Sequence, residues 1–251
     1  MTERKYLNKP DKQDNRDLLF AVRGVATPYE VDLRPKDAAG IFDQGYLGSC
    51  TANAICAFVS YLDKNFTYPS RLHFNYSVLF LYWKEREIEG TIDYDSGAYI
   101  RDGMKVAQKI GLAAGGTYPT EVSEFRSTPT QEAYDTAKHH KITEYRRLNA
   151  NTPAQLKESL ANGFPVVMGI EIYSSFEGDE VALTGVVPMP DRQSETFLGG
   201  HAVLAMGYTH IDGKEYIICR NSWGKGWGDK GYFYLPMDFV GRMISDMWTG
   251  R

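Results

Sequence analysis

The hydrophobic pattern of this chain changes character near Ala150, and this change limits the folds open to it. Before Ala150, apolar residues recur at helical spacing, which predicts helices from Cys50 onward, over 75–89 and over about 100–110. After Ala150, a helix opens with Thr152-Pro153. The strand-like runs beyond that helix lie at 166–173, 202–208, 216–220 and 231–235. A mainly helical part followed by a mainly β part predicts an α+β protein of two lobes.

The same change suggests where the lobes divide. Residues 1–30 start polar and end in Thr27-Pro28, and we predict a surface arm or short leader there. Residues 31–150 would form the mainly helical lobe and residues 151–251 the mainly β lobe. With 251 residues, 43% of them apolar, the chain can bury a core large enough for both.

Charge and cysteine content narrow the partners and the compartment. A net charge of −4 argues against nucleic acid as a partner. No apolar run has the length of a membrane span or of a signal peptide, so no membrane partner is expected. Three cysteines cannot all pair within one chain, which favours a reducing, cytoplasmic location. Export by a route that needs no signal peptide stays open, and so does the oligomeric state.

The run from Asp43 to Cys50 places a thiol at the expected start of a helix. The partial positive charge of a helix N-terminus favours the thiolate, so we expect a lowered pKa for this thiol. Gln44 lies six residues earlier and can donate to an oxyanion. Far downstream, Gly200-His201-Ala-Val supplies an imidazole and Asn221-Ser-Trp-Gly an amide. Together these groups indicate a cysteine nucleophile with an oriented base.

These motifs, in this order, resemble those of the papain-like cysteine peptidases (C1-type). The segments that carry the resemblance are Gln44-Gly-Tyr-Leu-Gly-Ser-Cys50, Gly200-His-Ala-Val203, Gly207-Tyr208, Asn221-Ser-Trp-Gly-Lys-Gly-Trp-Gly228 and Gly231-Tyr-Phe233. The resemblance extends over roughly residues 31–251. It implies a papain-like fold, in which a helical N-terminal lobe and an antiparallel β-barrel-like C-terminal lobe enclose the active-site cleft.

The resemblance also implies the catalytic roles. Cys50 would be the nucleophile, His201 its acid/base partner and Asn221 the residue that orients the imidazole. Gln44 and the backbone N–H of Cys50 would form the oxyanion hole, where the loss of one donor commonly costs about 2.7–4 kcal/mol in the barrier. No cofactor or metal is implied, and the partner would be an extended peptide or protein substrate.

Substrate binding is less sharply marked. Gly97 lies about where the family has a glycine-containing strand, and we expect it to offer main-chain hydrogen bonds to an extended peptide. Trp223 would cover the hydrogen bond between the imidazole and the amide and border the substrate. Residues that could shape the main specificity pocket are Met168, Leu198 and Met243.

Two positions near the nucleophile depart from the family signature. Leu47 stands in place of a cysteine, which removes a common disulfide, and Thr51 stands in place of tryptophan. Neither change removes a group needed for proton transfer. Cys56 and Cys219 are interpreted as small buried apolar residues.

The favoured function is a cysteine-type endopeptidase that acts through a thioester acyl-enzyme on Cys50, with His201 as acid/base. One alternative is a papain-fold thiol acyltransferase or peptide ligase, and another is a non-catalytic peptide-binding homologue. Thirty residues precede Val31. We expect that this segment either exerts no control or partly covers the cleft as a short arm.

Overall fold

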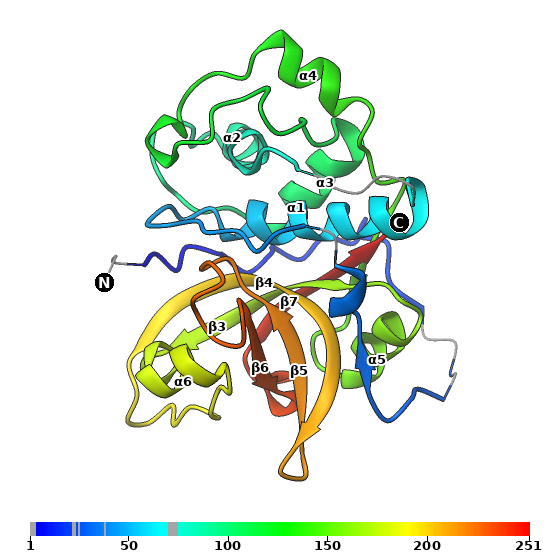
Figure 1. The fold of residues 1–251 in the computed structure, drawn as a ribbon, viewed down its shortest axis with the longest axis vertical. Coiled ribbons are helices and arrows are strands. Elements are labelled where there is room, and N and C mark those ends of the chain that lie inside the picture. Colours follow the sequence, from blue (N-terminus) through cyan, green and yellow to red (C-terminus); the bar gives the residue numbers. More distant parts are fainter. Residues whose placement is uncertain (1–3, 22–23, 25, 38, 70–74) are drawn as a thin grey trace.

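A computed structural model describes residues 4–21, 24, 26–37, 39–69 and 75–251. Helices gather in one lobe and strands in the other, and the N-terminal arm passes between the two (Figure 1). This arrangement confirms the expected α+β fold of two lobes. No helix of the described residues is long and apolar enough to cross a membrane.

The helical lobe is built around a completely buried helix. The helices of this lobe are α1 (Cys50–Leu62), α2 (Val78–Glu89), α3 (Ile100–Lys109) and α4 (Gln131–Ala137). Every residue of α1 is buried, because α2 and α3 pack on one side of it and the sheet on the other. A π-helical turn at Asp63–Thr67 continues α1. The predicted start at Cys50 is confirmed, so the thiol lies where the helical lobe meets the sheet.

The predicted helix over 75–89 starts three residues later than expected. The hydroxyl of Ser77 accepts a hydrogen bond from the backbone N–H of Phe80 at 3.2 Å and so caps α2. The helix ends at Gly90, whose φ of +70° is the left-handed conformation that favours glycine. In the second lobe, α5 (Pro153–Ala161) begins as expected, with Thr152 as its cap and proline in the first turn.

The second lobe is an antiparallel sheet. Its strands are β1 (Val31–Asp32), β2 (Tyr145–Leu148), β3 (Val166–Tyr173), β4 (Phe197–Ile211), β5 (Lys214–Arg220), β6 (Tyr232–Pro236) and β7 (Ile244–Gly250). They follow the order β2-β7-β3-β4-β5-β6, and β1 pairs separately with β4. A short helix, α6 (Asp179–Thr184), lies between β3 and β4. The sheet is an open path, so the barrel-like closure expected for this lobe is wrong: the end strands β2 and β6 do not pair with each other.

Three strands of the sheet, β1, β2 and β7, lie outside the runs predicted from sequence. β7 pairs with both β3 and β2. Because β2 precedes Ala150, the sheet takes in chain from before the expected lobe boundary.

The described part of the arm does not simply lie on the surface. It first runs between the two lobes and then reaches the free edge of β2 (Figure 1). There the N–H of Phe20 donates to the carbonyl of Arg147 at 2.8 Å, and the N–H of Arg147 donates to the carbonyl of Leu18 at 2.7 Å. The arm therefore contacts the helical lobe, the cleft and the edge of the sheet.

Candidate active site

The thiol of Cys50 lies at the N-terminus of α1, against β4. Backbone hydrogen bonds from Ala202, Thr51 and Cys50 itself reach the sulfur and favour its thiolate form. Ala202 directly follows His201 in β4, so the start of α1 and the middle of β4 meet at the nucleophile. The fold thus brings the expected nucleophile and the expected base together from opposite lobes.

The electrostatics of this thiol differ from the expectation. Burial, which outweighs the backbone hydrogen bonds, raises the pKa of Cys50 to about 12, and the nearby Glu85 carboxylate acts in the same direction. The predicted lowering of the thiol pKa is therefore wrong for the state described here. The physical reason is that the side chain is fully buried, and a thiolate removed from water loses its solvation.

His201 is held by the segment that links β5 to β6. Its Nε2 lies 2.9 Å from Oδ1 of Asn221, which also accepts from the N–H of Ser222 at 2.9 Å. An amide oxygen only accepts, so Nε2 carries the proton and Nδ1 keeps its lone pair. Nδ1 is buried and has no hydrogen-bond partner among the described residues. Burial lowers the pKa of His201 to about 4, which keeps the imidazole neutral.

The ring of Trp223 covers this pair. It stacks on the imidazole of His201, with 5.2 Å between centroids and 29° between planes. The indole also contacts Phe176 and Trp227, which hold it from behind. The pair of His201 and Asn221 is thus shielded from water on the side of the tryptophan.

Gln44 is fixed by two contacts. Its Nε2 donates to the carbonyl of Leu47 at 2.8 Å, and its Oε1 accepts from the hydroxyl of Ser222. The N–H of Gln44 also donates to the carbonyl of Ser222 at 3.0 Å. A carboxamide carries two N–H hydrogens, and Leu47 takes one of them. These bonds tie the loop before Cys50 to the segment that carries Asn221, a link that the sequence motifs did not reveal.

The arm covers the candidate catalytic groups. The ring of Tyr6 meets the imidazole of His201 edge-on, with centroids 6.1 Å apart, and meets Trp223 at the same distance. The guanidinium of Arg4 lies 3.7 Å from the centroid of the Trp223 ring, a cation–π contact. Cys50 and His201 are both fully buried in this arrangement.

The arm also uses the cleft as an extended peptide would. The N–H of Asn8 donates to the carbonyl of Gly200 at 3.0 Å, and the N–H of Lys9 donates to the carbonyl of Ala98 at 3.4 Å. Gly97, the expected main-chain partner, donates its N–H to the hydroxyl of Tyr82 instead. Gly97 lets the backbone of the arm come close to this segment, because a Cβ on Gly97 would lie 2.0 Å from the carbonyl oxygen of Leu7.

The side chain of Asn8 is buried between the sheet and α3. A Cβ on Gly169 would lie 2.7 Å from Nδ2 of Asn8, 2.6 Å from Oγ of Ser245 and 3.4 Å from the tip of Ile100. Sequence reasoning missed Gly169, Ser245 and Ile100. Of the pocket candidates that it named, Met168 and Met243 are buried in the core and Leu198 is half-buried. The only sequence signal for this region is the glycine pair before His201, which permits a backbone to approach closely.

Comparisons with known proteins agree with this geometry. Residues 27–244 match the family described as papain family cysteine protease. An uncharacterised peptidase C1-like protein of Acanthamoeba polyphaga mimivirus is 36% identical over 271 residues, which cover 96% of this chain and 84% of the viral protein. Chymopapain of Carica papaya is 29% identical over 236 residues, which cover 88% of this chain and 58% of chymopapain.

Solved structures give the same assignment. The crystal structure of xylellain, a cysteine protease from Xylella fastidiosa, is similar with a TM-score of 0.89 and 34% identity, over 100% of this chain and 98% of that one. The bromelain protease from Ananas comosus has a TM-score of 0.69 at 23% identity, over 89% of this chain and 98% of that one, which is a likeness of fold. This chain belongs to the papain family of cysteine proteases. It is a papain-like cysteine peptidase, a hydrolase.

Proposed function

We propose that this peptidase is an endopeptidase that cleaves peptide bonds through a thioester on Cys50. The observation that carries the proposal is the pairing of His201 with Asn221. This pairing fixes the tautomer with the proton on Nε2, so the lone pair of Nδ1 is available as a base. A base of this kind, next to a helix that begins with a thiol, has the parts that nucleophilic catalysis needs.

The proposed chemistry proceeds in two halves. His201 Nδ1 takes the proton of the thiol, and the thiolate attacks the carbonyl carbon of the substrate. The N–H of Cys50 and the free hydrogen of the Gln44 amide stabilise the oxyanion. The C–N bond then breaks, the imidazolium returns its proton to the leaving amine, and the thioester remains. Water, deprotonated by His201, attacks the thioester and releases the acid and the thiol.

The path of the arm supports internal cleavage. The arm enters the cleft at Arg4 and leaves it beyond Lys9, so a chain can extend past both ends of the groove. An endopeptidase needs such a groove, because its substrate continues on both sides of the scissile bond. The bound polypeptide would be held by main-chain hydrogen bonds to Gly200 and Ala98.

The arm would keep the enzyme in a closed, inactive state. Displacing it would return water to Cys50 and His201. Their two pKa values, about 12 and about 4 in the closed state, would then move towards each other. Proton transfer from thiol to imidazole becomes cheaper as that gap narrows.

Three measurements test the proposed function. A chain that begins at Tyr29, checked for a native melting transition, should hydrolyse peptides blocked at both termini faster than the full chain. An electrophilic epoxide should add once, on Cys50, and Cys50→Ala should abolish both cleavage and labelling. A thioester of Cys50 trapped at low pH would be seen as a mass increase. A truncated, folded chain that neither cleaves nor labels would favour the peptide-binding homologue.

Acyl transfer is separated from hydrolysis by an added amine. If the enzyme is a transferase or ligase, an amine in millimolar excess should yield mainly the transfer product. For the endopeptidase, the free acid should dominate even when the amine is present.

We also propose a cytoplasmic location. All three cysteines are free and buried, and none of them forms a disulfide in the described structure. A tagged full-length chain in its native cells should fractionate with a cytoplasmic marker. Recovery from the medium would favour the signal-independent export route.

A further inference from the structure

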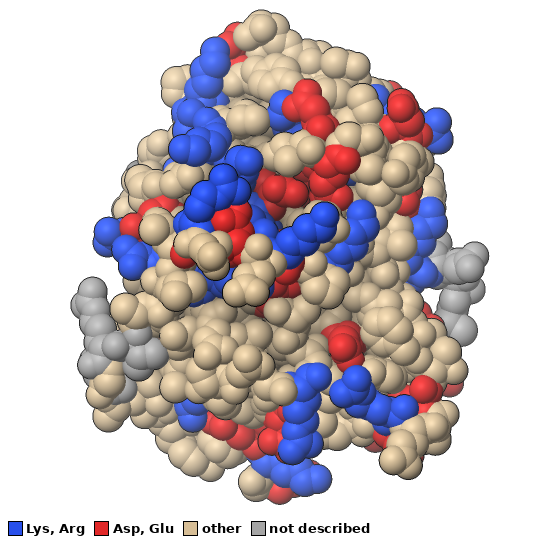
Figure 2. Space-filling view, turned by 180° about the vertical axis from the view of Figure 1, so that it is seen from behind, with Lys and Arg blue, Asp and Glu red and all other residues tan. Residues whose placement is uncertain are grey.

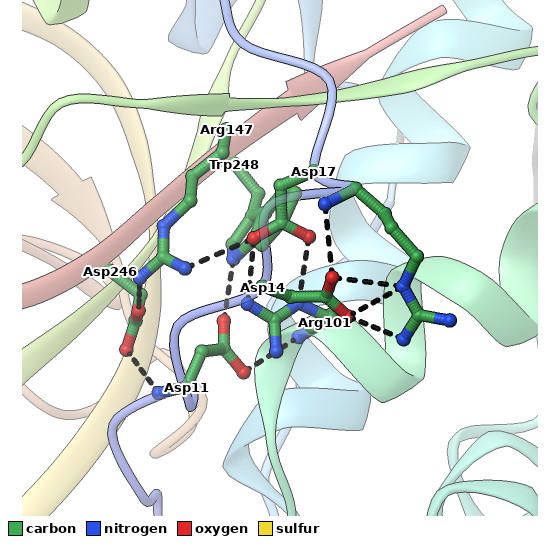
Figure 3. Close-up of polar contacts among 8 residues, drawn as sticks. Asp11, Asp14, Asp17, Arg101, Arg147, Asp246 and Trp248 are labelled. Carbon is green, nitrogen blue, oxygen red and sulfur yellow. Dashed lines mark hydrogen bonds and ion pairs between the residues drawn. The ribbon is translucent and has the colours of Figure 1, made fainter.

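The acidic part of the arm is bound by basic side chains at the junction of the lobes. The carboxylate of Asp17 accepts from Arg101 through Nε at 2.9 Å and through a terminal nitrogen at 2.7 Å. The oxygen at 2.7 Å also accepts from Arg147 at 3.1 Å (Figure 3). The side chain of Asp17 is only 7% exposed. The carboxylate of Asp17 is therefore buried between two guanidinium groups.

A second carboxylate of the arm lies beside the first. One oxygen of Asp11 accepts from the indole nitrogen of Trp248 at 2.7 Å, and the other accepts from the backbone N–H of Arg101 at 3.2 Å. The N–H of Asp11 donates to Asp246 at 2.9 Å. Both guanidinium groups lie over the ring of Trp248, at 5.7 Å for Arg101 and 5.5 Å for Arg147. The donors on the folded body thus converge on the acidic side chains of the arm.

Without the arm, the positive charges of this cluster would have too few carboxylate partners. Arg147 keeps the Asp246 carboxylate as its partner. The guanidinium of Arg101 has no ion-pair partner among the described residues other than Asp17. Two guanidinium groups that share one oxygen are also close enough to repel each other once that oxygen leaves. Without the arm, Arg101 loses its ion-pair partner and keeps only a longer-range attraction to the Asp102 carboxylate of the folded body.

The cluster is continuous with the cleft. Arg101 belongs to α3 of the helical lobe, while Arg147 and Trp248 belong to β2 and β7 of the sheet lobe. The arm passes from its main-chain bond at Lys9 to the contacts of Asp11 within two residues. On the face opposite that of Figure 1, Lys and Arg side chains are intermixed with Asp and Glu over the upper and middle part of the molecule (Figure 2). A peptide in the cleft can follow the same route to the basic pair.

We propose that Arg101, Arg147 and Trp248 form a carboxylate-binding site that selects substrates with an acidic side chain beyond the cleft. In the closed state Asp17 of the arm occupies this site, and in the open state an acidic side chain of the substrate takes its place. The substrate part of this inference rests on the proposed peptidase function. The class of ligand is an extended acidic peptide. Asp246 beside the site disfavours anions of higher charge, such as phosphate.

The first experiment measures binding and does not need catalysis. It uses the full chain with Cys50→Ala and Asp17→Asn, so that its own arm binds weakly, and a fluorescent peptide copying residues 4–20. This peptide should bind at least about tenfold more tightly than the same peptide with asparagine at the position of Asp17, because a buried charge pair is lost. A peptide with asparagine at the position of Asp14 is the comparison, since Asp14 hydrogen-bonds to Arg16 within the arm and reaches Arg101 only through a longer-range charge interaction.

Changing the site should remove this preference. In the same protein with Arg101→Gln in addition, the peptide that keeps Asp17 and the peptide with asparagine there should bind equally. Arg101→Lys, which keeps the charge, should retain part of the difference. Equal affinity of these two peptides for the protein with Arg101 intact would overturn the proposal. The proposal would also be overturned if the peptide changed at Asp14 lost as much affinity as the peptide changed at Asp17.

The second experiment measures selection. The full chain with Asp17→Asn alone should cleave a mixed peptide library with enrichment of aspartate or glutamate at one fixed distance from the cut, and Arg101→Gln should abolish that enrichment. Cleavage without acidic enrichment would overturn the proposal and leave the peptidase function intact. Absence of cleavage would count against the peptidase function, while the binding experiment would still decide whether the carboxylate site exists.

Discussion

The ring of Tyr6 stands edge-on against the imidazole of His201, with 6.1 Å between centroids and 88° between planes. A residue near the start of the chain thereby contacts the expected base of a site that is otherwise built from α1, β4 and the segment after β5. The contact adds to the cover over a base that is fully buried, and this burial lowers the pKa of His201 to about 4. The described state of this peptidase is thus a closed one, and the first prediction concerns opening it.

Replacing Gly200 with alanine should expel the arm. The atoms nearest to a Cβ at this position all belong to Asn8, and the first is its carbonyl oxygen at 2.2 Å. Gly200 does not have a positive φ, so alanine fits its backbone. We expect alkylation of Cys50 to accelerate at least about tenfold, in line with the loss of a few kcal/mol of docking. Mass spectrometry of the alkylated peptide measures the rate.

Gly226→Ala is the matched control for this variant, because a Cβ at that position meets nothing within 4 Å. Its alkylation rate should equal that of the unmodified chain. If Gly200→Ala reacted no faster than the control, the arm would not be what protects the thiol.

Raising the pH should loosen the arm. Burial, together with the nearby Asp246 carboxyl, raises the pKa of Asp11 to about 7 in the docked arm, whereas a free aspartate titrates near ~3.9. The docked state holds this proton more tightly, so the contribution of Asp11 to docking is greatest below about pH 4. This contribution weakens by up to about 1.4 kcal/mol per unit as the pH rises towards 7. The lowered pKa of His201 in the closed state acts in the opposite sense, and a His201→Gln variant removes that opposing titration. In the His201→Gln variant, a fluorophore on the N-terminal amine should show increasing mobility over this range.

The other charges around Asp11 do not reverse this direction. Burial also raises the pKa of Asp246, which acts in the same sense, and Arg101 and Arg147 stay charged throughout. In the Asp11→Asn variant the rise in mobility should be much smaller. Mobility that decreased from pH 4 to pH 7 in the His201→Gln variant would contradict the assignment.

Asn221→Ala should impair catalysis while the protein stays folded. The amide oxygen holds Nε2 of His201 at 2.9 Å and so sets which nitrogen faces the nucleophile. Loss of the residue that orients a catalytic imidazole lowers kcat by between about tenfold and 10⁴-fold. Steady-state kinetics on the chain that begins at Tyr29 should show the fall in kcat with a small change in KM. An unchanged kcat would exclude the orienting role.

Removing one side of a buried ion pair should destabilise the loop before the nucleophile. Arg220 and Asp37 pair with side-chain exposures of only 2% and 5%, and Arg220 also donates to the carbonyls of Ala39 and Gly40. Asp37→Ala would leave a buried guanidinium without its partner carboxylate. We expect a loss of about 3–5 kcal/mol in the free energy of unfolding, measured by urea denaturation. The exposed pair of Lys138 and Asp135 is the comparison, and Asp135→Ala should cost less than about 1 kcal/mol.

The local pattern of the sequence predicts most of the fold. It does not predict the strands whose charged side chains are paired with residues distant in the sequence. The helix at Cys50 and the strand at Val166 follow from periodicity alone. The strand β2 reads Tyr-Arg-Arg-Leu, and β7 contains the buried Asp246, so neither has the alternation of a half-buried strand. Arg147 and Asp246 are tolerated there because they pair with each other and with the arm. Such long-range compensation is not visible in a local window.

The same distinction applies to the site. The motifs identify Cys50, His201, Asn221 and Gln44 as candidates because each stands in a distinctive local setting, and their catalytic roles remain predictions. The surroundings of the Asn8 side chain include Gly169 and Ser245, two small residues without any local signature. The sign of the pKa shift at Cys50 was also missed, since it depends on burial beneath a distant segment of chain.

The backbone hydrogen bonds between the arm and β2 leave an unpaired strand edge when the arm detaches. Leu18 and Phe20 satisfy backbone groups of Arg147 at the outer edge of the sheet, and both Leu18 and Leu19 are more than half exposed. Once they detach, β2 offers unpaired donors and acceptors that a strand from a neighbouring molecule can take up. The activated peptidase would therefore have a concentration-dependent lifetime, limited by self-association through this uncovered border.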